Sequence, residues 1–138
     1  MSAREPAATT KPFSYALLRV VPRMERGERL NVGVVLFSRQ HDFLGLRTHL
    51  DAARLAALDP QLDPDPVRAR LEALRSVVCG AEEGGALAAL PPSERFGWLV
   101  APSSTIIQAS DVHTGLTDDP AATLDHLFGT LVSWPDRV

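Results

Sequence analysis

The sequence contains few of the residues that mark secreted, membrane or metal-binding proteins. Of its 138 residues one is a cysteine, Cys79, so neither an intramolecular disulfide nor a cysteine-based metal cage can form. The longest apolar run, residues 32–37, is far shorter than a membrane span. Residues 1–12 lack the apolar core of a signal peptide. We therefore expect a cytoplasmic protein that crosses no membrane.

A strong excess of basic residues is also missing. The net charge is −3 at pH 7, and acidic and basic residues are interspersed, whereas DNA-binding domains usually carry a basic excess. Aromatic residues make up only 6%, so Trp98 and Trp134 are expected to pack in the protein rather than to stack on bases. A nucleic-acid partner is not expected.

Motifs for metals and phosphate groups are missing as well. The two glycines at 84–85 are not followed by Lys and Ser or Thr, as a phosphate-binding loop requires. The histidines show no His-Glu-x-x-His pattern and no close paired spacing; they are His41, His49, His113 and His126. The sequence thus predicts no metal site and no cofactor.

What is present is the composition of a folded globular domain, with 45% hydrophobic and 22% charged residues. The length suits one domain, which we place at residues 13–134. A flexible segment, 1–12, precedes this domain, and a tail, 135–138, follows it.

Three segments near the N-terminus predict strands. Residues 15–21 are apolar on both alternating faces except for Arg19, and residues 30–37 are β-branched and apolar. Residues 43–50 place their leucines on one face. The short connections between these segments predict an antiparallel meander.

Capping signals predict the helices. Asp51 caps a short turn that runs to Leu58, and Asp65 followed by Pro66 starts a helix that ends at Gly80. Asp119 followed by proline starts a last helix, whose apolar stripe consists of Leu124, Leu127, Phe128, Leu131 and Val132.

The remaining segments complete the predicted fold. Residues 96–100 and 105–109 are expected to be a second strand pair, and residues 81–92 and 110–118 to be loops. The fold class is therefore α+β: a mainly antiparallel sheet of about five strands with two to three helices packed on one face.

Three sequence blocks together resemble a known family. They are Tyr-Ala-Leu-Leu-Arg-Val-Val-Pro at 15–22, Gly-Glu-Arg-Leu-Asn-Val-Gly-Val-Val-Leu at 27–36, and Arg-Phe-Gly at 95–97 with His-Thr-Gly-Leu at 113–116. In order and spacing they resemble the bacterial domain-of-unknown-function family 3037, from about residue 13 to residue 132. The resemblance implies a protein partner, a kinase similar to the toxin HipA, because family genes often sit beside genes for such kinases. It implies no catalytic residues.

The first candidate site is the rim of the opening hairpin, with Arg19, Glu25, Glu28 and Asn31. A carboxylate beside an arginine and an amide can bind a metal or orient a water molecule. The structural alternative is that the glutamates pair with nearby arginines and that Asn31 bonds the backbone. Arg19 lies within an apolar strand and must find a partner or reach the surface, because an unpaired buried charge is costly.

Three arginines, Arg23, Arg26 and Arg29, share the turn of this hairpin. Guanidinium groups bind phosphate well, but two glutamates interrupt the run. We expect ion pairs across a solvated turn rather than a nucleic-acid contact.

The second candidate site combines the hydroxyl-rich turn 103–105 with Ser110, Asp111, His113 and Thr114. A serine near a histidine and an acid suggests nucleophilic catalysis with His113 as base, but no Gly-x-Ser-x-Gly elbow is present. Hydroxyl groups in turns also satisfy nearby backbone groups, and polar loops often form recognition surfaces.

The sequence therefore favours a non-catalytic interaction or regulatory module. Its expected contacts are the turn 23–29 and the loop 110–116, and its candidate binding residues are Arg19, Arg23, Arg26, Arg29, Ser104 and Thr114. The alternative is a small hydrolase or nucleotide-processing enzyme that uses Glu28, Asn31 and His113 in one cleft. A protein partner is expected, and an exposed sheet edge can also pair with a second copy of the chain.

Overall fold

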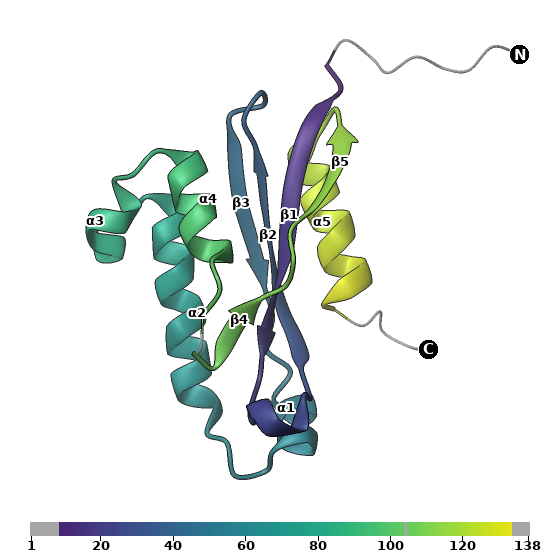
Figure 1. Ribbon diagram of the computed structural model, residues 1–138, viewed down its shortest axis with the longest axis vertical. Coiled ribbons are helices and arrows are strands. Elements are labelled where there is room, and N and C mark those ends of the chain that lie inside the picture. The colour runs from purple at the N-terminus through teal and green to yellow at the C-terminus, as the bar shows by residue number, and fades with distance from the viewer. Residues whose placement is uncertain (1–8, 104, 134–138) are drawn as a thin grey trace, which may run out of the picture.

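The computed structural model describes residues 9–103 and 105–133. The strands are β1 (Lys11–Val20), β2 (Leu30–Ser38), β3 (Phe43–Thr48), β4 (Ile107–Ala109) and β5 (His113–Thr117). The helices are α1 (Ala52–Leu58), α2 (Pro64–Cys79), α3 (Gly85–Ala88), α4 (Pro92–Val100) and α5 (Pro120–Leu131), with 3-10 turns η1 (Met24–Arg26) and η2 (Glu82–Gly84). The prediction of an α+β fold is confirmed, with more helices than expected (Figure 1). No helix in the described ranges is long and apolar enough to cross a bilayer.

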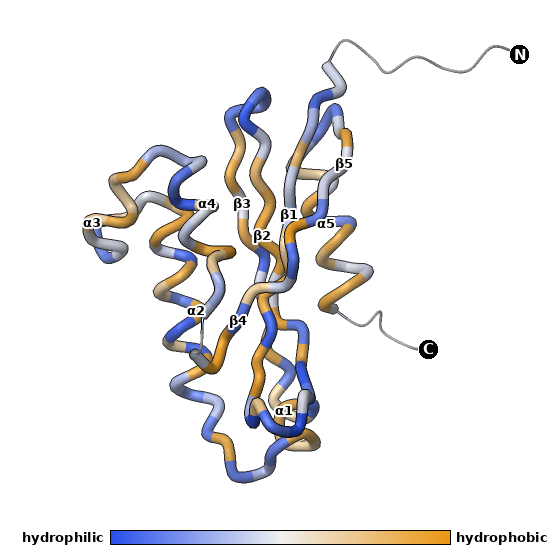
Figure 2. Tube along the Cα trace, in the orientation of Figure 1, coloured by the Kyte–Doolittle hydropathy of each residue, from blue (hydrophilic) through white to orange (hydrophobic). Residues whose placement is uncertain are grey.

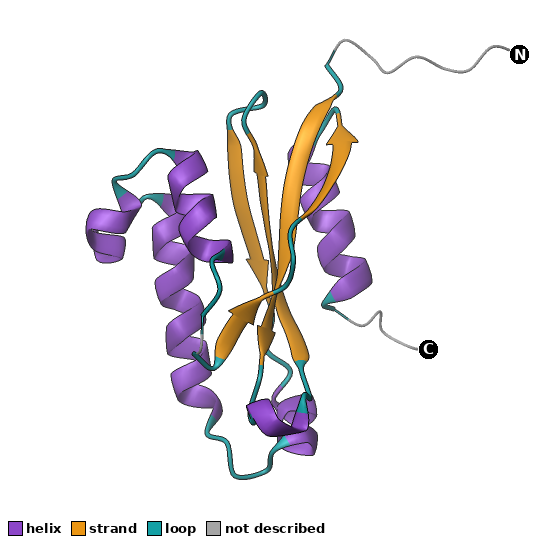
Figure 3. Cartoon of the chain, in the orientation of Figure 1, coloured by secondary structure: helices purple, strands orange, loops and turns teal. Residues whose placement is uncertain are grey.

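One antiparallel sheet organises the chain. Its strand order is β3-β2-β1-β4, and β5 also pairs with β1. The predicted meander of β1, β2 and β3 is confirmed. β4 pairs with residues 18–20 of β1 and β5 with residues 11–15, so the two short strands follow one another along the same side of β1 (Figure 3).

A register shift interrupts the pairing of β1 with β2. Leu18 lies opposite Gly33, but the next residue, Arg19, lies opposite Asn31, which leaves Val32 as an extra residue in β2. An extra residue of this kind is a β-bulge, a local kink that redirects side chains. Because directly paired residues point to the same side of a sheet, the shift places Arg19 and Asn31 side by side.

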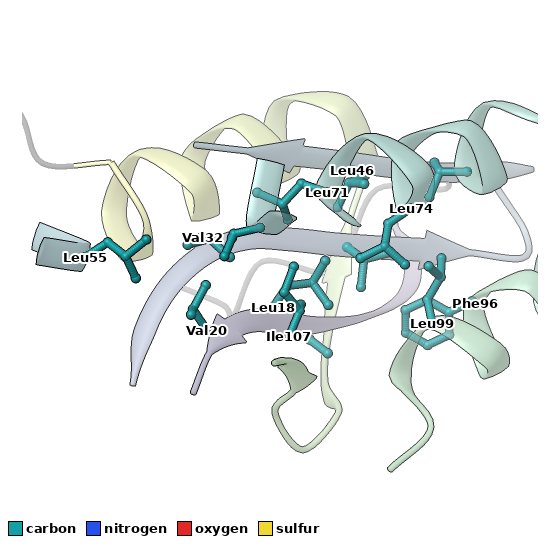
Figure 4. Packing of buried hydrophobic residues seen from close by; sticks show 14 residues of the cluster. Leu18, Val20, Val32, Leu46, Leu55, Leu71, Leu74, Phe96, Leu99 and Ile107 are labelled. Carbon is teal, nitrogen blue, oxygen red and sulfur yellow. The ribbon is translucent and has the colours of Figure 1, made fainter. Parts of the chain in front are cut away.

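Helices cover both faces of the sheet, so the expectation of helices on one face is wrong. On one face Leu18 and Val35 pack with residues of α1, α2 and α4, such as Leu55, Leu74 and Phe96 (Figure 4). On the other face, Val34 and Leu36 pack with α5 and the residue after it through Leu124 and Val132. β2 is apolar on both sides, so both faces of the sheet must be shielded from water (Figure 2). The apolar stripe of α5 must also be buried, and packing α5 on the second face meets both requirements.

Several helix boundaries follow the predicted caps. The Asp51 carboxylate accepts hydrogen bonds from the backbone N–H groups of Ala53 and Arg54, and Gly80 ends α2 with a φ of 70°. α2 starts two residues earlier than predicted, because two Asp-Pro pairs are adjacent and the first of them caps the helix. Asp63 is the cap, Pro64 is the first helical residue, and the second proline fits within the first turn.

Two other elements differ from the prediction. Residues 96–100 belong to a helix, α4, in which Phe96 and Leu99 are buried at helical spacing behind a proline at the helix start. Residues 113–117 form a strand rather than a loop. β1 also begins at Lys11, within the segment expected to be flexible.

Candidate functional site

Arg19 lies in a polar row that crosses three strands of the sheet. It pairs with Asn31 of β2 on one side and with Gln108 of β4 on the other. Since paired residues share a face, all three side chains lie on the α5 side of the sheet.

Arg19 is partly buried and lies near charges of both signs, those of Arg29 and Asp111. Its Nε is buried and has no hydrogen-bond partner among the described residues. Burial lowers the pKa of Arg19, the positive charge of Arg29 lowers it further, and the negative charge of Asp111 opposes both effects. The sequence predicts that Arg19 needs a partner or a path to the surface. Among the described residues the negative charge of Asp111 partly meets this need, but no acceptor bonds to Nε.

Asn31 connects the sheet to the last helix. Its Nδ2 donates to the carbonyl oxygen of Leu131 at 3.0 Å, across 100 residues of sequence. The prediction that Asn31 bonds the backbone is correct, but the bond goes to α5 rather than to its own turn.

A pocket of about 630 Å³ opens beside this row. β2 contributes Asn31, and Arg29 directly precedes this strand. α1 contributes Arg54, and Thr130 and Ser133 come from the C-terminal end of α5 and the loop after it. Arg54 is paired with Asp51, its Nε lying 3.5 Å from the carboxylate. Within the described part of the chain, the Arg29 side chain is exposed and makes no hydrogen bond or ion pair.

The other two arginines of the turn are paired, as expected. Arg23 Nη1 lies 4.0 Å from Glu25 and its Nε 3.8 Å from Asp59. Arg26 Nε donates to Glu28 at 2.5 Å. This hydrogen bond and the charge of its partner lower the pKa of Glu28 and raise that of Arg26.

The residues predicted in the loop 110–116 have structural roles or lie on β5. Ser110 Oγ accepts a hydrogen bond from the N–H of Leu17 at 2.9 Å and lies 2.9 Å from the carbonyl of Asp111. The hydroxyl thereby provides a hydrogen-bond acceptor for the backbone N–H of Leu17 at the point where β4 ends and β5 has not yet begun. Thr114 pairs with Ser14, and both His113 and Thr114 are exposed. Ser104 lies outside the described residues.

The three residues of the enzyme hypothesis do not share one cleft. Asn31 pairs with Arg19 on one side of β1, while His113 pairs with Tyr15 on the other side. Tyr15 and Arg19 are four positions apart along an extended strand, which corresponds to ~13 Å. His113 contacts Tyr15, with ring centroids 5.2 Å apart, and Glu28 is held by Arg26.

Trp98 is more exposed than a packing residue is expected to be. The residue is 37% exposed, and the Arg70 guanidinium lies 5.8 Å from the ring centroid. Trp134 lies outside the described residues. Among residues 9–103 and 105–133, no three His, Cys, Asp or Glu side chains cluster as a metal site requires.

Sequence reasoning identified Arg29 and Asn31, which line the pocket, and Arg19, which is paired with Asn31, but it missed the other polar residues of the pocket. Arg54, Thr130 and Ser133 come from helices or helix ends that are remote from the hairpin in sequence. No local pattern marks them, because they become neighbours only when α1 and α5 pack at the end of the sheet.

Most of the chain is similar to a known protein family. Residues 15–132 match the family described as protein of unknown function (DUF3037). No curated protein and no solved structure is significantly similar to the chain.

Proposed function

The chain belongs to the DUF3037 family, and we propose that it is a non-catalytic recognition module that binds an acidic group of a partner protein. The binding site is the pocket between β2, α1 and α5, with Arg29 as the main contact and Arg19 beside it. The observation that carries the proposal is the unused donor capacity of these two guanidinium groups.

Geometry supports an oxyanion as the bound group. Guanidinium presents its donors in a planar fork that matches a carboxylate, and charge-assisted hydrogen bonds of this kind are the strong ones. Arg29 and Asn31 line a concave surface, and Arg19 adjoins Asn31 in the register. Burial and, to a smaller extent, the positive charge of Arg29 lower the pKa of Arg19, and a bound anion between the two arginines would offset the repulsion between them.

Charge supports a protein rather than a nucleic acid as the partner. The net charge of the chain is −3, and Arg23 and Arg26 are already paired with acids of their own chain. A nucleic acid would need a wider basic surface. We place the module in the bacterial cytoplasm, and a HipA-like kinase is the first partner to test.

The experiment is capture from the native host at physiological salt, followed by mass spectrometry and by titration of the purified partner. Wild type is compared with Arg29→Gln and with Arg39→Gln, which removes an exposed arginine in the turn between β2 and β3. We expect a stoichiometric partner that Arg29→Gln binds about tenfold or more weakly, because a charge-assisted hydrogen bond contributes about 1.5–3 kcal/mol. Arg39→Gln is expected to bind normally.

Two outcomes would overturn the proposal. One is a partner that binds Arg29→Gln as tightly as wild type. The other is turnover of a substrate by the pure protein that His113→Ala abolishes, which would support the hydrolase or nucleotide-processing alternative. His113 lies outside the pocket, so the proposal requires that His113→Ala leaves partner binding unchanged.

A further inference from the structure

The outer edge of β5 has no strand beside it in the described part of the chain (Figure 3). Leu17 of β1 exchanges hydrogen bonds with Ser110, so the odd-numbered residues of β1 direct their backbone groups toward this side. Odd residues of β1 pair with odd residues of β5. By the alternation of antiparallel ladders, Thr114 and Leu116 direct their N–H and C=O groups away from β1.

β5 lacks the features that protect most exposed strand edges. Residues 113–117 contain no lysine, arginine, acid or proline, and their register with β1 is regular. Natural edge strands are usually guarded by charges, prolines or bulges. The opposite edge strand, β3, carries Arg47, which is paired with Asp125 of α5.

Apolar side chains are exposed along the same edge. Leu116 is 61% exposed and Val112 is 44% exposed. Their even numbers place them on one side of the strand, with Thr114 between them. This side chain pattern, apolar at both ends and a threonine at the centre, is the same when read in either direction.

We propose that β5 pairs antiparallel with β5 of a second copy of the chain, with the two-fold axis at Thr114. In this register Val112 of each copy faces Leu116 of the other, and the two Thr114 residues face each other. Apolar pairs and threonine pairs directly opposite one another stabilise antiparallel strands. Asp111 faces Thr117, so no two acids are opposed.

A neighbouring register fits less well. A two-fold axis at Gly115 would place Asp111 opposite Asp119 and would face Val112 with Asp118. Like charges directly opposite one another are destabilising. We infer a second copy of the chain as the partner of this edge because residues 111–117 are complementary to themselves when two copies run antiparallel.

The first test is sedimentation velocity over a wide concentration series. A single pair of short strands buries less surface than a standard stable interface, so we expect a monomer–dimer equilibrium rather than a permanent dimer. Leu116→Arg is expected to be monomeric at all concentrations, because the new charge would face Val112 of the other copy. Leu90→Arg, which changes a leucine that is 37% exposed on another surface, is expected to dimerise as wild type does.

The second test is cross-linking at the two-fold axis. In a Cys79→Ser background, Thr114→Cys is expected to form an intermolecular disulfide on mild oxidation, because the paired Cα atoms would lie ~5.5 Å apart. Asp118→Cys, an exposed position on the same side of the chain, is the matched control and is expected to cross-link far more slowly. Circular dichroism checks that each variant is folded.

Three results would overturn the proposal: a wild type that is monomeric throughout, a dimer that Leu116→Arg leaves intact, or equal cross-linking at the two cysteine positions. A monomer that captures a partner strongly, with capture lost in Leu116→Arg, would assign the edge to that partner instead. Failure here is distinguishable from failure of the recognition site, since that site is tested through Arg29 and does not involve Leu116.

Discussion

The side chain of Asn31 holds the end of α5 against the sheet, since its Nδ2 donates to the carbonyl oxygen of Leu131 at 3.0 Å. Asn31 is near the start of β2, and Leu131 is the last residue of α5. The bond therefore closes one wall of the pocket that also contains Arg29 and Thr130. This hydrogen bond is therefore expected to contribute both to the stability of the fold and to the shape of the proposed binding site.

Asn31→Ala is expected to destabilise the protein by about 1–2 kcal/mol, because a partly buried carbonyl loses its donor. Urea denaturation measures the change, and hydrogen exchange should show earlier opening of the last turn of α5. Gln40→Ala, in the exposed turn between β2 and β3, is the control and should change stability little. Equal stability of the two variants would contradict the structural role of Asn31.

Ser110→Ala is expected to cost about 1–3 kcal/mol, because the N–H of Leu17 loses the hydroxyl that accepts its hydrogen bond. The comparison is Ser103→Ala, which removes a hydroxyl from an exposed turn. Thermal unfolding measures both. If Ser110→Ala were as stable as Ser103→Ala, the hydroxyl would not be needed at the break between β4 and β5.

Gly45→Ala and Gly97→Ala are expected to have opposite effects. A Cβ at Gly45 would lie 2.7 Å from Leu124 of α5 and 2.7 Å from the ring of Phe43, so overpacking should cost about 1–3 kcal/mol. A Cβ at Gly97 would meet nothing within 4 Å on α4, where alanine should stabilise the helix by about 0.5–1 kcal/mol. Denaturant midpoints with unchanged m-values would test both expectations.

The carboxyl of Glu28 is expected to titrate below its usual range, because Arg26 bonds to its ionised form. A carboxyl whose pKa is lower in the folded protein adds stability above its unfolded pKa, and this contribution is lost as the pH falls through the folded pKa. Carboxyl NMR should show the pKa of Glu28 rising in Arg26→Gln and unchanged in Arg39→Gln. An unshifted Glu28 in wild type would contradict this ion pair.

Arg19→Met separates recognition from folding. A buried Nε without a partner does not stabilise the fold, so replacement by an apolar side chain should change the free energy of unfolding by less than about 1 kcal/mol. Binding of the captured partner should fall about tenfold or more, by the same reasoning as for Arg29. A large loss of stability would instead make Arg19 a structural residue.

Much of the fold follows from local patterns. Two of the three predicted caps, Asp51 and Asp119, start helices as expected, because a carboxylate at that position satisfies N–H groups of the first turn. The apolar segment 30–37 is a strand because its β-branched residues suit a pleated surface. The helix α4 is not apparent from the sequence, because the apolar residues Phe96, Leu99 and Val100 lie in a segment short enough to fit either a helix or a strand. The strand β5 is not apparent either, because it is mostly exposed and contains a glycine, so its residues show no alternation of apolar and polar side chains.

Residues close together in the chain are enough to predict the α+β class, the meander, the caps of α1 and α5, and an arginine, Arg19, within an apolar strand. Packing between distant elements was needed to show that α5 covers the opposite face, that Asn31 bonds Leu131 and that Arg29 and Arg54 share a pocket. These contacts join segments far apart in sequence. Their formation depends on how helices and strands pack at the end of the sheet, and local propensity carries no information about that.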